Sequence, residues 1–434
     1  MSLACPAVSR ERKTAWLVFI VLLGFLVAVT AHYIVGQYVM RGYPYSTFLF
    51  KPQDATGFPG QPNILGVHHF GDLFEAWITS RGPHPYVDFP LKAPSSYLPV
   101  THIILFPLAQ LSFELALVLY LVAFTAAFVV LVFIHAAGDR VSRTQAALVL
   151  TVCSTPVLFL VDRANVEGLL FLLLVATMLA YRRERFYLAA MLLAIPVAMK
   201  GSAGVFWLLF LFDGKFLALL TSLLTFAVAS VASLLILPGS TEANVEGLRA
   251  ALKMLFKATG EGTTGLRHSA SLKSTFDGLG RIDEHFNFFV VNYAAVSFVL
   301  LVGVAVVLAI LRPVLWQRVA LISAAMIVVP SVSYEYRMVH VFLPLLLFLG
   351  TSQRRRADAL FVALFGLLLV PKGLPILHGD VNIGTVVNPS LLLVLMLAVV
   401  IDAASDEPGR RRLRLIARMV RQRRLRPESA PAAT

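Results

Sequence analysis

A short stretch with unusual charge, "VDRANVEGLL" (161–170), lies between two apolar runs. It contains four polar or ionisable side chains within six positions: Asp162, Arg163, Asn165 and Glu167. Ionisable groups at membrane depth are costly and are therefore candidates for function. In a functional interpretation, Arg163 binds an anionic head group while Asp162 and Glu167 fix its rotamer. In a structural one, Asp162 is a helix N-cap and Arg163 pairs with Glu167 four residues on.

A carboxylate that could act as a general base lies in "HHFGDLFEAW" (68–77). Asp72 and Glu75 are one turn apart if this piece is helical, with aromatic residues beside them. An amphipathic helix would press those aromatics onto the bilayer and hold Asp72 at its edge, where partial desolvation favours a basic carboxylate. The alternative is that Asp72 only begins or caps that helix.

Three further segments each offer a cation. In "IPVAMKGSAG" (195–204), Pro196 and the glycines predict two short helices that meet at Lys200, a lysine that either snorkels or binds phosphate. The other two segments are "PSVSYEYRMVHVFLP", with Glu335 and Arg337, and "LRHSASLKSTFDGLG", with His268. Cations gathered from several segments indicate an anionic lipid head group as the ligand.

The elements that must position these residues are membrane helices. The chain has 434 residues, of which 58% are hydrophobic and only 14% are charged. Repeated long apolar runs predict an all-α polytopic membrane protein, and outer-membrane barrels lack such runs. About twelve spans are expected: 14–35, 113–136, 145–161, 166–181, 186–200, 202–213, 217–238, 288–311, 317–333, 338–350, 357–371 and 388–403.

Charge distribution predicts the orientation of these spans. Five basic clusters all face the cytoplasm if two conditions hold. The clusters are 139–143, 182–185, 312–318, 353–356 and the C-terminal tail. The N-terminus must lie inside, and the short apolar stretch 98–111 must be re-entrant or interfacial. The candidate residues then share the outer face, whereas transporters more often place ionisable groups near the midplane.

Two parts are expected, a membrane domain (1–404) with a long first outer loop (36–97), and a cytoplasmic tail (405–434). Nine arginines between 410 and 426 account for most of the net charge of +13. The tail is interpreted as an amphipathic helix on anionic membrane lipids or as a solvated segment, and not as a nucleic-acid site. No Cys/His metal spacing, Walker loop or GxSxG elbow occurs in the sequence.

An ordered series of motifs resembles the GT-C class of membrane glycosyltransferases, and within it glycosyltransferase family 87, the polyprenyl-phosphate-mannose-dependent α-mannosyltransferases and their bacterial relatives. The segments that carry the resemblance are "GDLFEAWITSRGPHPY", "SYLPVTHIILFPLAQLS", "DRANVEGLLFLLLVATMLAYRRERFYLAAMLLAIPVAMKGS", "HSASL" and "SVSYEYRMVHVFLPLLL". Two positions depart from the family pattern. Ala164 stands where the motif has Gly, and Tyr336–Arg337 stand near the place of paired histidines.

The resemblance implies a hexosyltransferase at the outer face of a bacterial inner membrane, with both termini cytoplasmic. The donor would be a polyprenyl-phosphate sugar, and the acceptor a glycolipid or glycan. No cofactor is implied, and a divalent metal is left open. Asp72 would be the base of an inverting transfer. The phosphate ligands would be Arg163, Lys200 and Arg337, supported by Asp162, Asn165, Glu167, Glu335 and His268.

Two other functions remain possible from the sequence. A transporter or flippase of a lipid-linked saccharide would use the same cations to escort a phosphate head group, and it would need a polar path to the cytoplasmic face. A ligase or polymerase of surface polysaccharide is the second alternative. The glycosyltransferase alone requires Asp72 for transfer.

Overall fold

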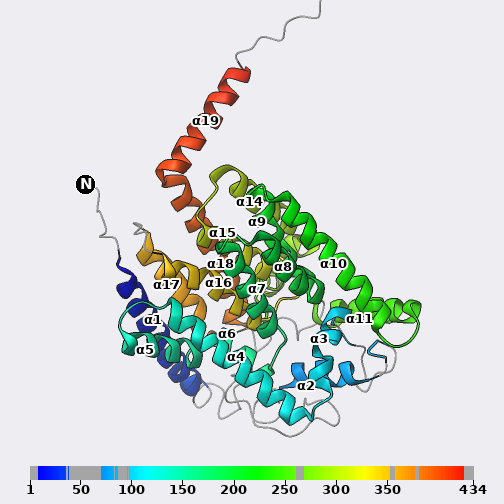
Figure 1. The fold of residues 1–434 in the computed structure, drawn as a ribbon. Coiled ribbons are helices and arrows are strands. Elements are labelled where there is room, and N and C mark those ends of the chain that lie inside the picture. The colour runs from blue at the N-terminus through cyan, green and yellow to red at the C-terminus, as the bar shows by residue number, and fades with distance from the viewer. Residues whose placement is uncertain are drawn as a thin grey trace, which may run out of the picture.

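The computed structural model describes residues 8–35, 38, 70–82, 84–86, 95, 97–260, 268–351, 357–376 and 381–424. Most of the first outer loop, the basic cluster at 353–356 and the end of the tail lie outside these residues. The described part of the chain is a bundle of helices with one antiparallel pair of two-residue strands, β1 (Pro375–Ile376) and β2 (Val381–Asn382) (Figure 1). The expected all-α membrane fold is confirmed.

Among the described residues, five helices are long and apolar enough to cross a membrane: α1 (Arg10–Ile34), α4 (Phe113–His135), α10 (Phe216–Ile236), α14 (Tyr293–Leu311) and α18 (Ile383–Ser405). A sixth span is possible if α5 (Arg140–Val152) and α6 (Thr155–Arg163), bent by 55°, count as one. The expected count of about twelve is not confirmed. Most of the remaining expected spans are helices too short to cross alone, because a helix rises about 1.5 Å per residue and the apolar core is about 30 Å thick.

The shorter helices complete the bundle. They are α2 (Gly71–Arg81), α3 (Pro99–Ala109), α7 (Glu167–Arg182), α8 (Phe186–Met199), η2 (Gly201–Phe206), α9 (Trp207–Phe212), α11 (Thr241–Gly260), α12 (Leu272–Gly280), η4 (Glu284–Phe286), α13 (Asn287–Val291), α15 (Leu315–Val328), η5 (Glu335–Val341), α16 (Phe342–Gly350), α17 (Asp358–Leu369) and α19 (Glu407–Arg424). The stretch 98–111 thus forms one short helix, α3, which packs on α2, α8 and α10.

Several helices begin where their sequence supplies a cap. The Ser112 hydroxyl accepts from the Leu115 amide at the start of α4, and the Asp139 carboxylate accepts from the Ser142 amide at the start of α5. Each cap satisfies an amide that has no partner within its own helix. The start of α4 agrees with the expected span 113–136, whereas α5 begins five residues before the expected span 145–161.

The core lies around α15 and α16, which are apolar on all sides. Nearly every residue of α15 is buried because the helix packs against α16, α18 and η5. By contrast, α10 and α14 lie at the periphery and expose apolar side chains such as Leu217, Val228 and Phe298. Apolar exposure of this kind suits helices that face lipid.

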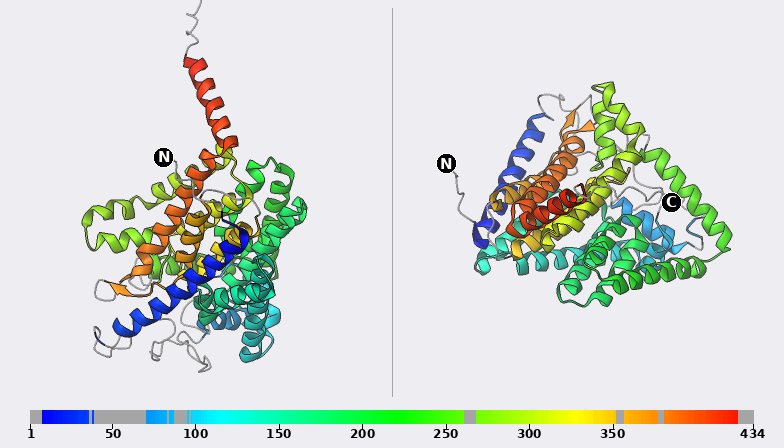
Figure 2. Two further views of the ribbon diagram at one scale, coloured as in Figure 1. Left: turned by 90° about the vertical axis from the view of Figure 1, so that its left-hand side faces the viewer. Right: turned by 90° about the horizontal axis from the view of Figure 1, so that it is seen from above.

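The termini of the bundle gather at one end. The Arg10 guanidinium donates to the Leu349 carbonyl at 3.0 Å, and the Arg412 guanidinium donates to the Leu311 carbonyl. Helix α19 projects away from the bundle in Figure 1 and in the left view of Figure 2, and α2 lies at the opposite end from it. The tail is therefore helical through Arg424, as the amphipathic interpretation expects.

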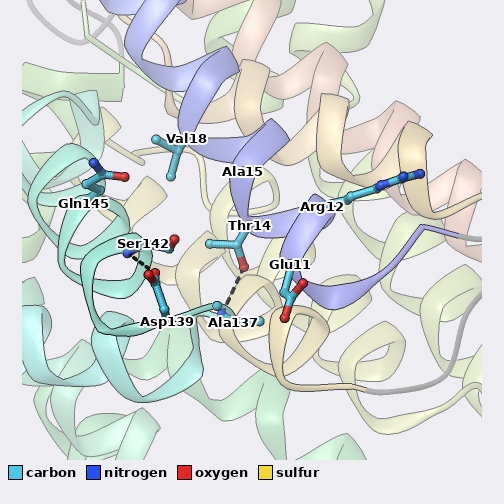
Figure 3. Close-up of a pocket in the computed structure, with 10 residues that line it drawn as sticks. Glu11, Arg12, Thr14, Ala15, Val18, Ala137, Asp139, Ser142 and Gln145 are labelled. Atoms are coloured by element: carbon cyan, nitrogen blue, oxygen red, sulfur yellow. Dashed lines mark hydrogen bonds between the residues drawn. The ribbon is translucent and has the colours of Figure 1, made fainter.

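A surface cavity of about 390 Å³ lies between the start of α1 and the turn that joins α4 to α5 (Figure 3). The Thr14 hydroxyl accepts from the Ala137 amide at 3.1 Å beneath it, and Asp139 caps α5 at its rim. These contacts join α1 to the α4–α5 turn.

Candidate active site

Asp72 lies in the first turn of α2, and the helix is predicted correctly from the sequence. The cap position is Phe70, with a left-handed φ of 54°, and Asp72 does not cap the helix. The aromatic face of α2 is buried in protein: the Phe74 ring packs edge-on against Phe113 at 5.1 Å between centroids. The expectation that these aromatics press on the bilayer is therefore wrong for Phe74, because α4 covers it.

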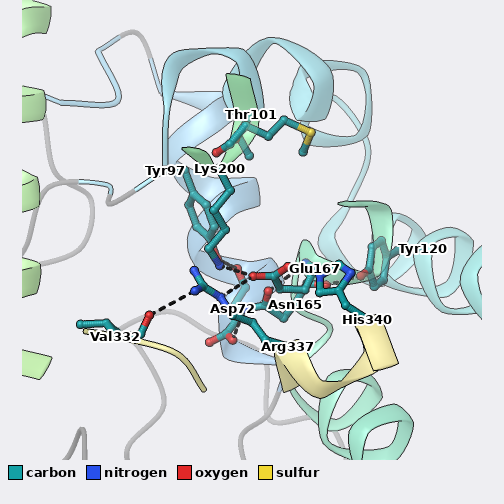
Figure 4. A network of polar contacts seen from close by, with 11 residues as sticks. Asp72, Tyr97, Thr101, Tyr120, Asn165, Glu167, Lys200, Val332, Arg337 and His340 are labelled. Carbon is teal, nitrogen blue, oxygen red and sulfur yellow. Dashed lines mark hydrogen bonds and ion pairs between the residues drawn. The ribbon is translucent and has the colours of Figure 1, made fainter. Parts of the chain in front are cut away.

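The carboxylate of Asp72 is bound at both oxygens. Arg163 Nη1 donates to Oδ1 at 2.9 Å, and Asn165 Nδ2 donates to Oδ2 at 2.6 Å. Figure 4 shows Asp72 and Asn165 side by side in a larger polar network. The side chains of Arg163 and Asp72 remain 25% and 15% exposed, so a ligand can reach this ion pair.

The turn between α6 and α7 presents Arg163 and Asn165 to Asp72. Helix α6 ends at Arg163, and Ala164 follows with a left-handed φ of 49°. An L-residue is strained in this conformation, which glycine adopts readily. The Tyr120 hydroxyl donates to the Asn165 carbonyl and secures the turn.

This turn corrects the local interpretation of the charged stretch. Asp162 lies in the last turn of α6 and is not an N-cap, since the cap position of α7 is Val166. No continuous helix joins Arg163 to Glu167, so the expected pair four residues apart does not form. Arg163 instead binds Asp72, 91 residues away in the chain. The expected role of Glu167 in fixing the Arg163 rotamer is likewise wrong.

Glu167 is the centre of a buried network. Its Oε1 contacts Lys200 Nζ at 2.6 Å and accepts from Arg337 Nε at 2.9 Å, while its Oε2 lies 2.8 Å from His340 Nε2. The Glu167 amide donates to Asn165 Oδ1 at 2.9 Å, which links this network to Asp72. The structure thus brings all three predicted cations to one site, and Figure 4 shows Lys200 and Arg337 on Glu167.

Local backbone geometry explains how the cations reach Glu167. Helix α8 ends at Met199, and Lys200 is extended (φ −156°) before η2 begins, as the sequence predicts. Arg337 and His340 belong to η5, a 3-10 helix with about three residues per turn. Residues three apart are therefore aligned, and both side chains point to the same carboxylate.

Aromatic rings cover one side of the ion pairs. The Phe159 ring stacks on Tyr336, and the Arg163 guanidinium lies 5.5 Å from the Phe159 centroid and 6.0 Å from that of Tyr334. The Lys200 ammonium lies 5.7 Å from the Tyr336 ring. Such cation–π contacts stabilise charges that have left bulk water.

The tyrosine hydroxyls beside Asp72 stay protonated. Burial, together with the carboxylates of Glu75 and Asp72, raises the pKa of Tyr97 well above its ordinary value. Burial also raises the pKa of Tyr334, against the opposing effect of Arg163. A tyrosine of this kind donates a hydrogen bond and is a poor base near neutral pH. Asp72 is the better base at this site.

Two predicted supporting residues lie in a second cluster. His268 Nδ1 is 3.9 Å from Glu335 Oε2, and Asn388 Nδ2 donates to Glu335 Oε1 at 3.0 Å. Sequence reasoning missed Asn388 and left His340 out of the site. His340 follows Arg337 by three residues, a spacing that fits an α-helix as well as a 3-10 helix, and Asn388 lies within an apolar helix pattern, so neither residue gave a distinct signal.

In the described part of the chain, no group of three or more His, Cys, Asp or Glu residues is placed to hold a metal ion. The site consists instead of two carboxylates, three cations, an amide and a buried histidine. This chemistry suits an anionic ligand next to a hydroxyl that must lose a proton.

The profile of glycosyltransferase family 87 matches residues 96–334, which is more than half of the chain. The chain belongs to glycosyltransferase family 87. The matched segment of this glycosyltransferase contains Arg163, Asn165, Glu167 and Lys200. Asp72 precedes the segment, and Arg337 follows it, yet both are joined to it by ion pairs. A comparison with curated proteins found no significant match.

Proposed function

We propose that this family 87 glycosyltransferase transfers a sugar from a polyprenyl-phosphate carrier to a hydroxyl of a glycolipid or glycan, at the outer face of a bacterial inner membrane. A hexose such as mannose is the first candidate sugar. The observation that carries the proposal is the Asp72 carboxylate beside a buried network with excess positive charge.

The charge of the network favours a lipid monophosphate as donor. In the ion pairs of the site, two carboxylates, Asp72 and Glu167, face three cations, which leaves one net positive charge when His340 is neutral. An uncompensated buried charge is costly. A sugar–phosphate–lipid diester carries a single negative charge and balances it.

The residues of the site then have separate roles in an inverting transfer. Asp72 removes the proton of the acceptor hydroxyl while its oxygen forms a bond to the anomeric carbon. The bond from that carbon to the phosphate oxygen breaks, and the lipid phosphate leaves with the electron pair. Arg163, Lys200 and Arg337 stabilise the charge that develops on this phosphate.

This mechanism requires Arg163 to change partner. In the unliganded site its guanidinium occupies Oδ1 of Asp72. A donor phosphate would compete for Arg163 and free that oxygen to accept a proton. Asn165 would retain Oδ2 and hold the carboxylate in place.

The test is sugar transfer by the full-length protein in nanodiscs. The probe is a radiolabelled polyprenyl-phosphate mannose, with parallel glucose and arabinose donors, and a membrane lipid extract supplies acceptors. Asp72→Asn preserves size and is expected to lower transfer at least about 1,000-fold. Full activity in this variant overturns the role of Asp72.

Asp139→Asn is the matched control. Asp139 is also an aspartate at the start of a helix, but it lies by α1 and α5 and caps the Ser142 amide. Asparagine retains the capping function, so this variant should transfer sugar at the wild-type rate. An equal loss in both variants would indicate damage to the fold.

A further inference from the structure

A second group of polar residues, here called the Glu335 cluster, lies beside the candidate active site; Glu335, Asn382 and Asn388 are buried, and His268 and Lys372 are half-buried. It comprises His268, Glu335, Lys372, Asn382 and Asn388. Asn388 Nδ2 lies 3.0 Å from Glu335 Oε1, and Asn382 Nδ2 lies 3.3 Å from His268 Nδ1. Lys372 Nζ donates to the Val370 carbonyl at 2.8 Å. The cluster joins three separate segments of the chain.

The Glu335 cluster has hydrogen-bonding capacity that the described residues do not fill. Asn388 is 5% exposed, and its Oδ1 has no partner among them. Within the same described part, the Lys372 ammonium donates only to one carbonyl, although it carries three N–H groups. Glu167, by contrast, is saturated by three side chains. The buried Asn388 oxygen calls for a ligand or water, and the half-buried Lys372 ammonium has further N–H groups to offer the same ligand.

The charge of the Glu335 cluster selects the kind of ligand. Lys372 and Glu335 carry opposite formal charges, and the asparagine amides are neutral, so the cluster needs no counter-ion. An ammonium, a carboxylate and an amide oxygen together match a ligand with several hydroxyl groups, each of which both donates and accepts. The cluster thus fits a neutral sugar, whereas the Glu167 network fits an anion.

One aromatic ring connects the Glu335 cluster to the ion pair of the site. The Phe159 centroid lies 5.3 Å from the His268 ring and 5.5 Å from the Arg163 guanidinium, and Arg163 binds Asp72. The Phe159 ring is therefore shared by the Glu335 cluster and the ion pair of Asp72, which makes the two sites neighbours. Gly384 packs directly against Glu335 Oε1, where a side chain would displace the carboxylate.

We propose that the Glu335 cluster is the acceptor subsite, and that it binds the hydroxyl groups of a neutral sugar on the acceptor. The proposal rests on the proposed function and adds the chemistry of the second substrate to it. Glu335, Asn388 and Lys372 hold the acceptor sugar so that one of its hydroxyls faces Asp72.

The experiment measures binding of simple glycosides to the full-length protein in nanodiscs. The probes are octyl glycosides of mannose, glucose and galactose, and the matching methyl glycosides. Asn388→Leu and Lys372→Met are each expected to weaken glycoside binding at least about tenfold while polyprenyl phosphate binds as in the wild type. Tighter binding of the octyl series identifies a glycolipid acceptor, and equal binding identifies a free glycan.

Asn244→Leu is the matched control. Asn244 is also a buried asparagine whose Nδ2 donates to a carbonyl, that of Pro238, and whose Oδ1 has no partner among the described residues. The control variant should bind glycosides as the wild type does, with a loss of thermal stability comparable to that of Asn388→Leu.

Unchanged glycoside binding in both cluster variants would overturn the acceptor subsite, as would a wild-type protein that binds none of the six probes. Neither outcome affects the proposed transfer reaction, which the separate loss of activity in Asp72→Asn tests. Loss of polyprenyl phosphate binding in the cluster variants would also count against a separate subsite.

Discussion

Arg163 and Asp72, 91 residues apart in the chain, form an ion pair of 2.9 Å at the edge of a buried polar network. If Arg163 also binds the donor phosphate, its loss should impair catalysis more than folding. Arg163→Met is expected to lower kcat/KM for the donor about 100- to 1,000-fold, the effect of removing one transition-state donor. Steady-state kinetics with varied polyprenyl-phosphate sugar measure this.

Arg143→Met is the control for this substitution, because Arg143 also lies over an aromatic ring, that of Phe133, outside the site. This variant should retain the wild-type kcat/KM. A purely structural Arg163 would give the opposite result: a lower unfolding temperature with donor kinetics near the wild type.

Glu167 neutralises two cations and binds a histidine in the interior, so its removal should damage the fold. Glu167→Ala leaves Lys200 and Arg337 without their shared carboxylate, and we expect a loss of about 3–5 kcal/mol in unfolding free energy. Chemical denaturation in detergent micelles measures it. Glu114→Ala, at an exposed position in the first turn of α4, should cost less than about 1 kcal/mol. Equal costs would refute the central role of Glu167.

The sequence predicted the local elements of the site. The α2 helix, the break at Lys200 and the short α3 helix follow from caps, prolines and apolar periodicity, which act over a few residues. The pairing of charges did not follow, because Arg163 and Glu167 find partners on other elements. The period of η5 was also hidden, since nothing local distinguishes three residues per turn from 3.6.

Span number was the least predictable feature of the fold. Apolar runs mark burial, and in this protein burial comes from neighbouring helices as well as from lipid. Helix α15 is apolar because protein surrounds it, so its composition resembles that of a spanning helix although it has only 14 residues. Hydropathy alone does not separate these two environments.

Ala164 provides a test of backbone strain at the site. Its left-handed φ of 49° disfavours any side chain, so Ala164→Gly should stabilise the protein by about 1 kcal/mol. Thermal unfolding in detergent measures the change. Ala189→Gly, in the buried interior of α8, should instead destabilise by about 1 kcal/mol, since glycine is costly within helices. A lower unfolding temperature for Ala164→Gly would contradict the strain assigned to Ala164.

The lowered pKa of Lys372 predicts that the stability of the folded protein depends on pH. Burial lowers its pKa from 10.5 to about 8, against the opposing effect of Glu335. The folded protein therefore releases a proton between these pH values that the unfolded chain keeps, and stability rises with pH across this window. Below about pH 8 the folded protein bears the full cost of burying the charged Lys372 ammonium, which lowers the free energy of unfolding by at most about 3 kcal/mol.

Lys372→Met removes this ionisation. We expect the variant to be more stable than the wild type at pH 7, because methionine fills the site without a charge to desolvate, and the advantage should shrink as the pH approaches 10. The difference in unfolding midpoint between the two proteins is measured at each pH across this range. Contributions from groups that both proteins share, including Glu335 and His268, largely cancel in this difference. A difference that stays constant from pH 7 to 10 would show that Lys372 does not titrate in this window.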